Sequence, residues 1–210
     1  MRLRVLLACL LPAACASTPS AQAVHELHWT GEATVFAGER RIELGVETRV
    51  VPFVHATSDT WLRDQGKATL RTMEVGPEGG FMTRDGKRTP MPAAMLEHER
   101  LQYATYSLML PPAWRGDGTT VTPLPAVDGR SRMRIEREGA PASTLSFDAE
   151  GRLVALENSV PDPEGHGVVR QRFTFEGEIA DAGIRWPRTI RIAQDGKPYF
   201  ELRIATFEAR

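Results

Sequence analysis

The residues best suited to metal chemistry in this chain are its five histidines, His25, His28, His55, His98 and His166. A zinc or copper site needs several such side chains to converge with carboxylates or thiolates. Glu97, His98 and Glu99 resemble the start of a zinc-protease helix, but Gln102 stands where the motif H-E-x-x-H requires its second histidine. We therefore expect no zinc-protease site, and we expect His98 to be a solvated or rim residue on its helix.

Nucleophilic chemistry finds equally little support in the sequence. It contains no Gly-x-Ser-x-Gly elbow and no glycine-rich phosphate loop with Lys and Ser or Thr. Carboxylates could pair on strands, as Asp59 beside Trp61 or Glu157 with Glu176, but paired acids on β-hairpins usually form a solvated face. We expect a protein that is not an enzyme, with no catalytic residue, no metal and no cofactor.

The composition indicates one soluble domain. The chain has 210 residues, a formal charge of −1, 41% apolar and 25% charged residues, all close to the averages of soluble proteins. These values argue against disorder, a membrane-embedded body and a nucleic-acid partner. The 18 glycines and 15 prolines suit many short strands and turns better than long helices.

Residues 1–23 differ from the rest of the chain. Arg2 and Arg4 precede the short apolar run 5–11, which is the pattern of an export signal and is far shorter than the roughly 20 residues that span a bilayer. We therefore expect a signal peptide over 1–23 and a single domain over 24–210.

Two processing sites compete within this leader. Cleavage after Ala23 would follow the small-x-small rule and remove both cysteines from the mature chain. The segment 11–15 instead resembles a bacterial lipoprotein box that ends at Cys15. Lipid on Cys15 would attach the protein to a membrane leaflet, and both alternatives stay open.

The body of the chain shows the period-two alternation of strands. Leu27, Trp29, Ala33 and Val35 alternate with polar residues, and the pattern returns over 41–50 and at intervals to Phe207. Residues 92–110 break this rhythm and fit one amphipathic helix bounded by prolines, and a Gly- and Pro-rich stretch follows over 114–125. We expect about nine to eleven antiparallel strands and one main helix.

Such a pattern favours a curved antiparallel sheet that forms an incomplete β-barrel, a mainly β (α+β) fold with the helix as its lid. The apolar face of a large sheet must be covered, and one helix covers only part of it. The rest must enclose a ligand-sized cavity or be filled by the protein's own side chains. We expect Trp29 and Trp186 to anchor the core, and an exposed Trp114 could gate a cavity.

The hairpin-like segments 145–153, 183–188 and 195–200, together with the Trp-containing first strand and the Pro-bounded helix, resemble the outer-membrane lipoprotein carrier and receptor (LolA/LolB-like) superfamily. This resemblance implies an incomplete barrel around a helical lid, a hydrophobic cavity for acyl chains and no catalytic centre. It also implies a location in the periplasm, or on the periplasmic face of a membrane, in a Gram-negative bacterium.

The leading hypothesis is thus an exported envelope protein that holds a lipid or a lipoprotein acyl chain. Strand parity and helix spacing predict twelve cavity-lining residues: Leu44, Val46, Met95, Leu96, Tyr103, Tyr106, Phe173, Phe175, Ile190, Ile192, Leu202 and Ile204. A structural or adaptor module with a filled core is the alternative, and an unrecognised hydrolase or metal-dependent enzyme ranks last.

Overall fold

The computed structural model describes residues 24–210. Its first half contains six strands and its helices: β1 (Leu27–Ala37), β2 (Arg40–Val51), β3 (His55–Leu62), the 3-10 helix η1 (Gly66–Thr69), β4 (Arg71–Gly76), β5 (Gly79–Arg84), β6 (Lys87–Pro90), α1 (Ala93–Leu108) and the 3-10 helix η2 (Pro111–Arg115). Its second half contains nine strands: β7 (Thr119–Val127), β8 (Arg130–Arg137), β9 (Ser143–Phe147), β10 (Leu153–Pro161), β11 (Val168–Glu176), β12 (Ile179–Asp181), β13 (Ile184–Trp186), β14 (Thr189–Gln194) and β15 (Lys197–Ala209).

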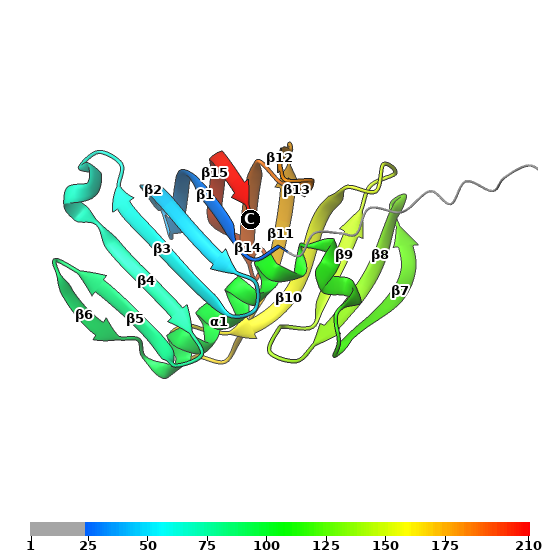
Figure 1. Cartoon of the computed structure of the whole chain (residues 1–210), viewed down its shortest axis with the longest axis horizontal. Coiled ribbons are helices and arrows are strands. Elements are labelled where there is room, and N and C mark those ends of the chain that lie inside the picture. Colours follow the sequence, from blue (N-terminus) through cyan, green and yellow to red (C-terminus); the bar gives the residue numbers. More distant parts are fainter. Residues whose placement is uncertain (1–23) are drawn as a thin grey trace, which may run out of the picture.

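Thirteen of these strands form one antiparallel sheet in the order β6-β5-β4-β3-β2-β1-β15-β14-β11-β10-β9-β8-β7, and β12 pairs with β13 alone. The sheet curves strongly and stays open, because β6 and β7 do not pair with each other in the described chain (Figure 1). The expected fold class is confirmed. The strand number exceeds the nine to eleven expected, since several strands are short and separated by two-residue turns.

The segment around β7 corrects a prediction. Pro123 and Pro125 indicated an irregular stretch, yet both lie in a strand. Proline has no backbone N–H to donate to a neighbouring strand, so it is tolerated mainly in an edge strand of a sheet. β7 pairs only with β8, which explains why its prolines fit.

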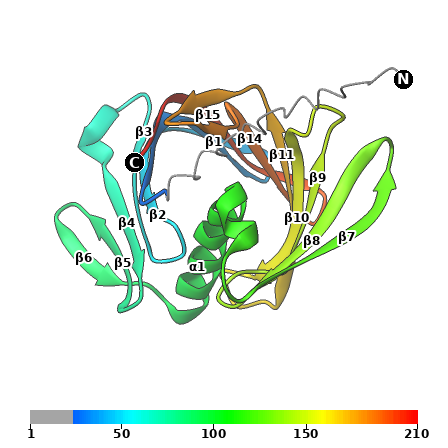
Figure 2. The same ribbon diagram turned by 45° about the vertical axis from the view of Figure 1, so that its right-hand side comes forward.

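The order of the strands dictates where the helix lies. β1 pairs with β15, from Leu27 opposite Ala209 to Val35 opposite Phe200, so the first and last strands meet in the middle of the sheet. The two edge strands, β6 and β7, are therefore consecutive strands in the chain, and α1 and η2 connect them. The helix crosses the concave side, enclosed by the two arms of the sheet (Figure 2).

The helix agrees with its sequence pattern. Its first residue follows Pro92, and it ends three residues before Pro111, close to the expected range 92–110. Trp114 Nε1 donates a hydrogen bond of 2.8 Å to the carbonyl oxygen of Leu108, which satisfies one of the last free carbonyls of the helix. Trp114 is half-buried and packs edge-on against Phe147, so it anchors the helix end and is not the exposed gate that we considered.

The core fills the centre of the concave side. Trp29 stacks on Trp186 at 5.9 Å between ring centroids, and Trp186 stacks on Phe207 at 5.5 Å. Both tryptophans are at most 2% exposed, which confirms them as core anchors. Burial of each such side chain stabilises the fold by about 1.5–3 kcal/mol or more, so this cluster holds β1, β13 and β15 together.

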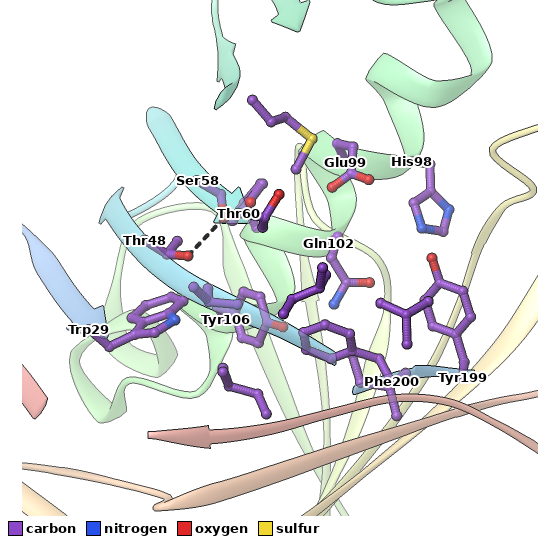
Figure 3. Close-up of a pocket in the computed structure, with 17 residues that line it drawn as sticks. Trp29, Thr48, Ser58, Thr60, His98, Glu99, Gln102, Tyr106, Tyr199 and Phe200 are labelled. Atoms are coloured by element: carbon purple, nitrogen blue, oxygen red, sulfur yellow. Dashed lines mark hydrogen bonds between the residues drawn. The ribbon is translucent and has the colours of Figure 1, made fainter. Parts of the chain in front are cut away.

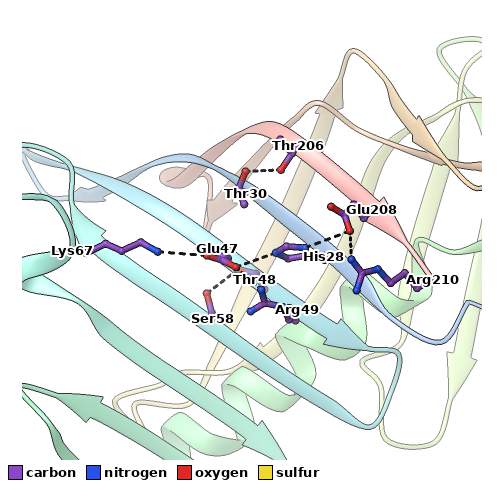
Figure 4. Close-up of polar contacts among 10 residues, drawn as sticks. All are labelled: His28, Thr30, Glu47, Thr48, Arg49, Ser58, Lys67, Thr206, Glu208 and Arg210. Atoms are coloured by element: carbon purple, nitrogen blue, oxygen red, sulfur yellow. Dashed lines mark hydrogen bonds and ion pairs between the residues drawn. The ribbon is translucent and has the colours of Figure 1, made fainter.

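The convex face of the sheet is charged, as the alternation predicts. Glu47 accepts hydrogen bonds from His28 at 3.2 Å and from Arg49, and Lys67 lies 3.8 Å from its other oxygen (Figure 4). Partial burial opposes ionisation, but the bonds from Arg49 and His28 prevail and lower the pKa of Glu47. The ion pairs face solvent, so they keep this side polar and contribute little to stability.

Candidate functional site

A cavity of about 220 Å³ lies between the middle turns of α1 and the concave face of the sheet (Figure 3). The sheet supplies residues from β1 to β4, β14 and β15, and the helix supplies five residues in its middle turns. The C-terminal end of α1 packs against solid core, where Leu108 is fully buried. The interior is thus filled in one part and hollow in another.

The sheet side of the cavity is mainly apolar. The inward positions of β2 alternate with the charged outward ones, so Leu44, Val46 and Thr48 face the hollow. Ile192 of β14 and Leu202 of β15 also occupy inward positions of their strands and line the cavity. The remaining apolar lining comes from Trp29, Val35, Met73 and Phe200.

The helix side is polar. Glu99, Gln102, Tyr103 and Tyr106 are spaced by three, one and three residues, which places them on one face of an α-helix. Across the cavity, the hydroxyls of Thr48 and Ser58 share a hydrogen bond of 2.9 Å, and Thr60 adds another hydroxyl. The cavity therefore has a polar helix wall and a mainly apolar sheet wall that carries the hydroxyl groups of Thr48, Ser58 and Thr60.

Glu99 is the one carboxylate that lines this cavity. Its side chain forms no hydrogen bond and no ion pair with any residue of the described range 24–210, and it retains some accessible surface because it faces the hollow (Figure 3). Burial raises its pKa to about 7. Near neutral pH this carboxyl group is thus poised between its neutral and charged forms.

Three tyrosines surround the same space. Burial, reinforced by the charge of Glu99, raises the pKa of Tyr103, Tyr106 and Tyr199. All three hydroxyl groups therefore stay protonated at physiological pH. The rings of Tyr103 and Tyr106 lie 6.1 Å apart, which makes this wall aromatic as well as polar.

His98 corrects a prediction. The expectation of a solvated rim residue is wrong, because its side chain is 2% exposed and lies beneath the β10–β11 connection. Its Nδ1–H donates a hydrogen bond of 2.7 Å to the carbonyl oxygen of Pro161, which fixes the orientation of the ring. The ring and the hydroxyl of Tyr199 point toward one another at the end of the cavity (Figure 3).

Buried amides fasten the helix to the second arm of the sheet. Gln171 Nε2 donates to Gln102 Oε1 at 2.9 Å, and Asn158 Nδ2 donates to the hydroxyl of Thr105 at 2.9 Å. Gln102 Nε2 lies close to the hydroxyl of Tyr106 but is in no hydrogen-bond geometry with any described residue.

Six of the twelve predicted lining residues do face the cavity: Leu44, Val46, Tyr103, Tyr106, Ile192 and Leu202. Phe173, Phe175, Ile190 and Ile204 belong to the solid core instead. Met95 and Leu96 lie half-buried in the first turn of α1, away from the hollow. Strand parity identified the inward face, but it could not show which inward residues the helix covers.

The polar residues of the cavity were not predicted from the sequence. Glu99 and Gln102 share a helix face with the predicted Tyr103 and Tyr106, so the helical spacing could have indicated them. Thr48 follows the predicted Leu44 and Val46 at the same parity. The possible lipidation site Cys15 lies outside the described residues.

The part of the chain that the structure describes shows neither a metal site nor a pair of adjacent carboxylates at the positions considered from the sequence. Residues 24–210 hold no cluster of three His, Cys, Asp or Glu side chains suited to a metal ion. Glu157 pairs with Arg172, and Glu176 pairs with Arg191, on the exposed face. Over the same residues, none of the helices combines the length and apolarity needed to cross a bilayer.

Comparison with known proteins identifies the fold. No protein-family model matches the sequence, and no curated protein matches it. A LolA superfamily protein from Nitrosomonas europaea superposes with a TM-score of 0.57 at 8% identity, over 88% of this chain and 86% of that one. The chain has the LolA-like fold. The resemblance inferred from the sequence is confirmed at this level.

Two further structures agree. A domain classed as an outer membrane lipoprotein-sorting protein domain, from Vibrio parahaemolyticus, gives a TM-score of 0.56 at 10% identity and covers 90% of this chain and 87% of its own. A DUF1329 family protein from Desulfovibrio piger gives 0.56 at 8% identity, with coverage of 90% and 87%. The TM-scores establish a shared LolA-like fold. Sequence identities this low do not allow binding residues to be transferred to this chain.

Proposed function

We propose that this protein is a cell-envelope carrier that holds the apolar chain of a lipid or of a lipoprotein between α1 and the sheet. The observation that carries the proposal is the cavity of about 220 Å³ on the concave side of a LolA-like fold. One of its structural neighbours is classed as a lipoprotein-sorting domain. Binding would rest on burial of apolar surface and would need no covalent step.

The size of the cavity limits what it holds. A void of about 150 Å³ accepts benzene, and pockets for drug-sized ligands measure roughly 300–1,000 Å³. The cavity of about 220 Å³ therefore suits one chain segment on the order of ten carbons. Burial of such a segment is worth about 0.8 kcal/mol per methylene, before the cost of association.

A second hollow offers more length. A groove of about 180 Å³ runs beside Val50, Phe53 and Val75, and Tyr103 lines both spaces. A different rotamer of Tyr103 would join the two into one longer channel. We infer that this ring sets the chain length that the cavity accepts.

The edges of the sheet do not favour the adaptor alternative. β6 has four residues, and prolines at 123 and 125 remove two backbone donors from β7. Short edge strands and edge prolines are the devices that prevent pairing with another chain. The sheet edges therefore support the adaptor hypothesis, in which a partner strand pairs with the sheet, less well than the carrier hypothesis.

The leader completes the proposal. We infer that residues 1–23 direct export and that the protein works in the periplasm of a Gram-negative bacterium, either free after cleavage at Ala23 or anchored through Cys15. Radioactive palmitate incorporated by the wild type and lost in a Cys15→Ala variant would support the anchor. Label that persists in the variant would refute it.

Native mass spectrometry of the gently purified protein tests the carrier itself. We expect co-purified lipid on the wild type and its loss from Val46→Phe, because Val46 is 4% exposed and lines the cavity. Val121→Phe, on an exposed position of β7, is the matched control and should keep the lipid. A wild type without bound lipid that also fails to take up added fatty chains would refute the proposal.

A further inference from the structure

The charge balance of the cavity is unusual for a site that would hold only a hydrocarbon chain. Glu99 projects into it from α1, and no Lys or Arg is among the residues that line it. The titratable groups around it are His98, Tyr103 and Tyr106 on the helix and Tyr199 on β15. His98 already donates its Nδ1–H to the carbonyl oxygen of Pro161.

A carboxylate enclosed in this way gains from a positive partner. Taking an ion from water into a protein interior costs several kcal/mol by general estimates, unless an opposite charge and hydrogen bonds compensate it. The described chain offers no such partner to Glu99, whose pKa responds to burial alone. A ligand can supply the missing charge.

The surrounding rings favour the same kind of ligand. Charged Glu99 raises the pKa of Tyr103, Tyr106 and Tyr199, so an ion beside its carboxylate lies within electrostatic reach of their phenol groups. Faces of aromatic rings attract cations within about 6 Å. A carboxylate or phosphate headgroup would instead meet the charge of Glu99 with no cation in the lining to offset it.

Building on the proposed carrier function, we propose that the cavity selects ligands whose apolar chain ends in a protonated amine, with the Glu99 carboxylate as the counter-ion. The chain lies along the apolar wall formed by Leu44, Val46 and Leu202. The ammonium group reaches the helix side, where Glu99 accepts its hydrogen bonds and the tyrosine rings flank it. An alcohol of equal length keeps the apolar contact but lacks the charge.

Calorimetric titration with octylamine, 1-octanol and octanoate tests this selection, because the three probes share one chain length within the capacity of the cavity. We use the full chain at pH 8, where an alkyl amine is protonated and Glu99 is ionised. The wild type should bind octylamine at least tenfold more tightly than 1-octanol and should bind octanoate most weakly.

Variants on the same helix assign the effect. Glu99→Gln should abolish the preference for octylamine and leave the affinity for 1-octanol within about threefold, as an isosteric change keeps the apolar wall. Glu99→Asp retains the charge and should retain part of the preference. Glu97→Gln removes the same charge from an exposed position of α1 and should behave as the wild type.

The outcomes separate this inference from the carrier function. Equal binding of octylamine and 1-octanol by the wild type, tighter binding of octanoate, or a preference that survives Glu99→Gln would overturn the amine selection and leave the carrier standing. Failure of all three probes to bind the folded wild type would overturn both.

Discussion

Replacement of Glu99 by Gln should make the protein more stable at alkaline pH. Burial raises the pKa of this group from 4.5 to about 7, so the folded state binds its proton more tightly than the unfolded state does. Between these two values the folded chain carries more protons, and stability must fall as the pH rises. Above pH 7 the folded state keeps the full loss of stability that comes from ionising Glu99.

The magnitude follows from the shift. The rise from 4.5 to about 7 corresponds to at most about 3–4 kcal/mol, at about 1.4 kcal/mol per pKa unit. Much of it develops between pH 5 and pH 8, where the wild type should lose about 2–3 kcal/mol through this group. Glu99→Gln cannot ionise and avoids this loss.

Urea unfolding at pH 5 and pH 8 measures the effect. The stability of Glu99→Gln relative to the wild type should rise by about 2–3 kcal/mol between the two pH values. Glu97→Gln, exposed on the same helix, should track the wild type at both. Parallel pH profiles for the wild type and Glu99→Gln would show that Glu99 is solvated in the folded state, and the reasoning would be wrong.

Three further changes probe the core, the helix attachment and the channel. Phe173→Ala, at a fully buried position, should cost about 3–5 kcal/mol in urea unfolding; a cost below 1 kcal/mol would contradict a solid core there. Gln171→Leu leaves Gln102 Oε1 unpaired and should cost about 1–3 kcal/mol, most of which Gln102→Leu in the same chain restores; additive losses would exclude a coupled pair. Tyr103→Ala should join the two hollows and shift the tightest-binding alcohol from about ten carbons to a longer chain in calorimetric titration; an unchanged optimum would exclude Tyr103 as the dividing wall.

Local patterns were enough to predict the elements. Alternation along β1 and β2 predicted strands and their inward faces, because side chains of a strand point to opposite sides whatever the strand pairs with. The bounding prolines predicted the single helix for a similar reason, since Pro111 cannot continue a helix at its C-terminal end. β7 escaped prediction because its prolines are tolerated only through its place at the sheet edge.

The sequence by itself determined that this chain builds a curved antiparallel sheet with one helix, and which residues of each strand turn inward. Only the tertiary structure decided which inward residues touch one another and which border empty space. Phe173 and Val46 have the same apolar character and inward parity, yet one packs in solid core and the other lines the cavity. The difference arises from the path of α1 between the two edges of the sheet, a long-range arrangement that also buries His98 and encloses Glu99.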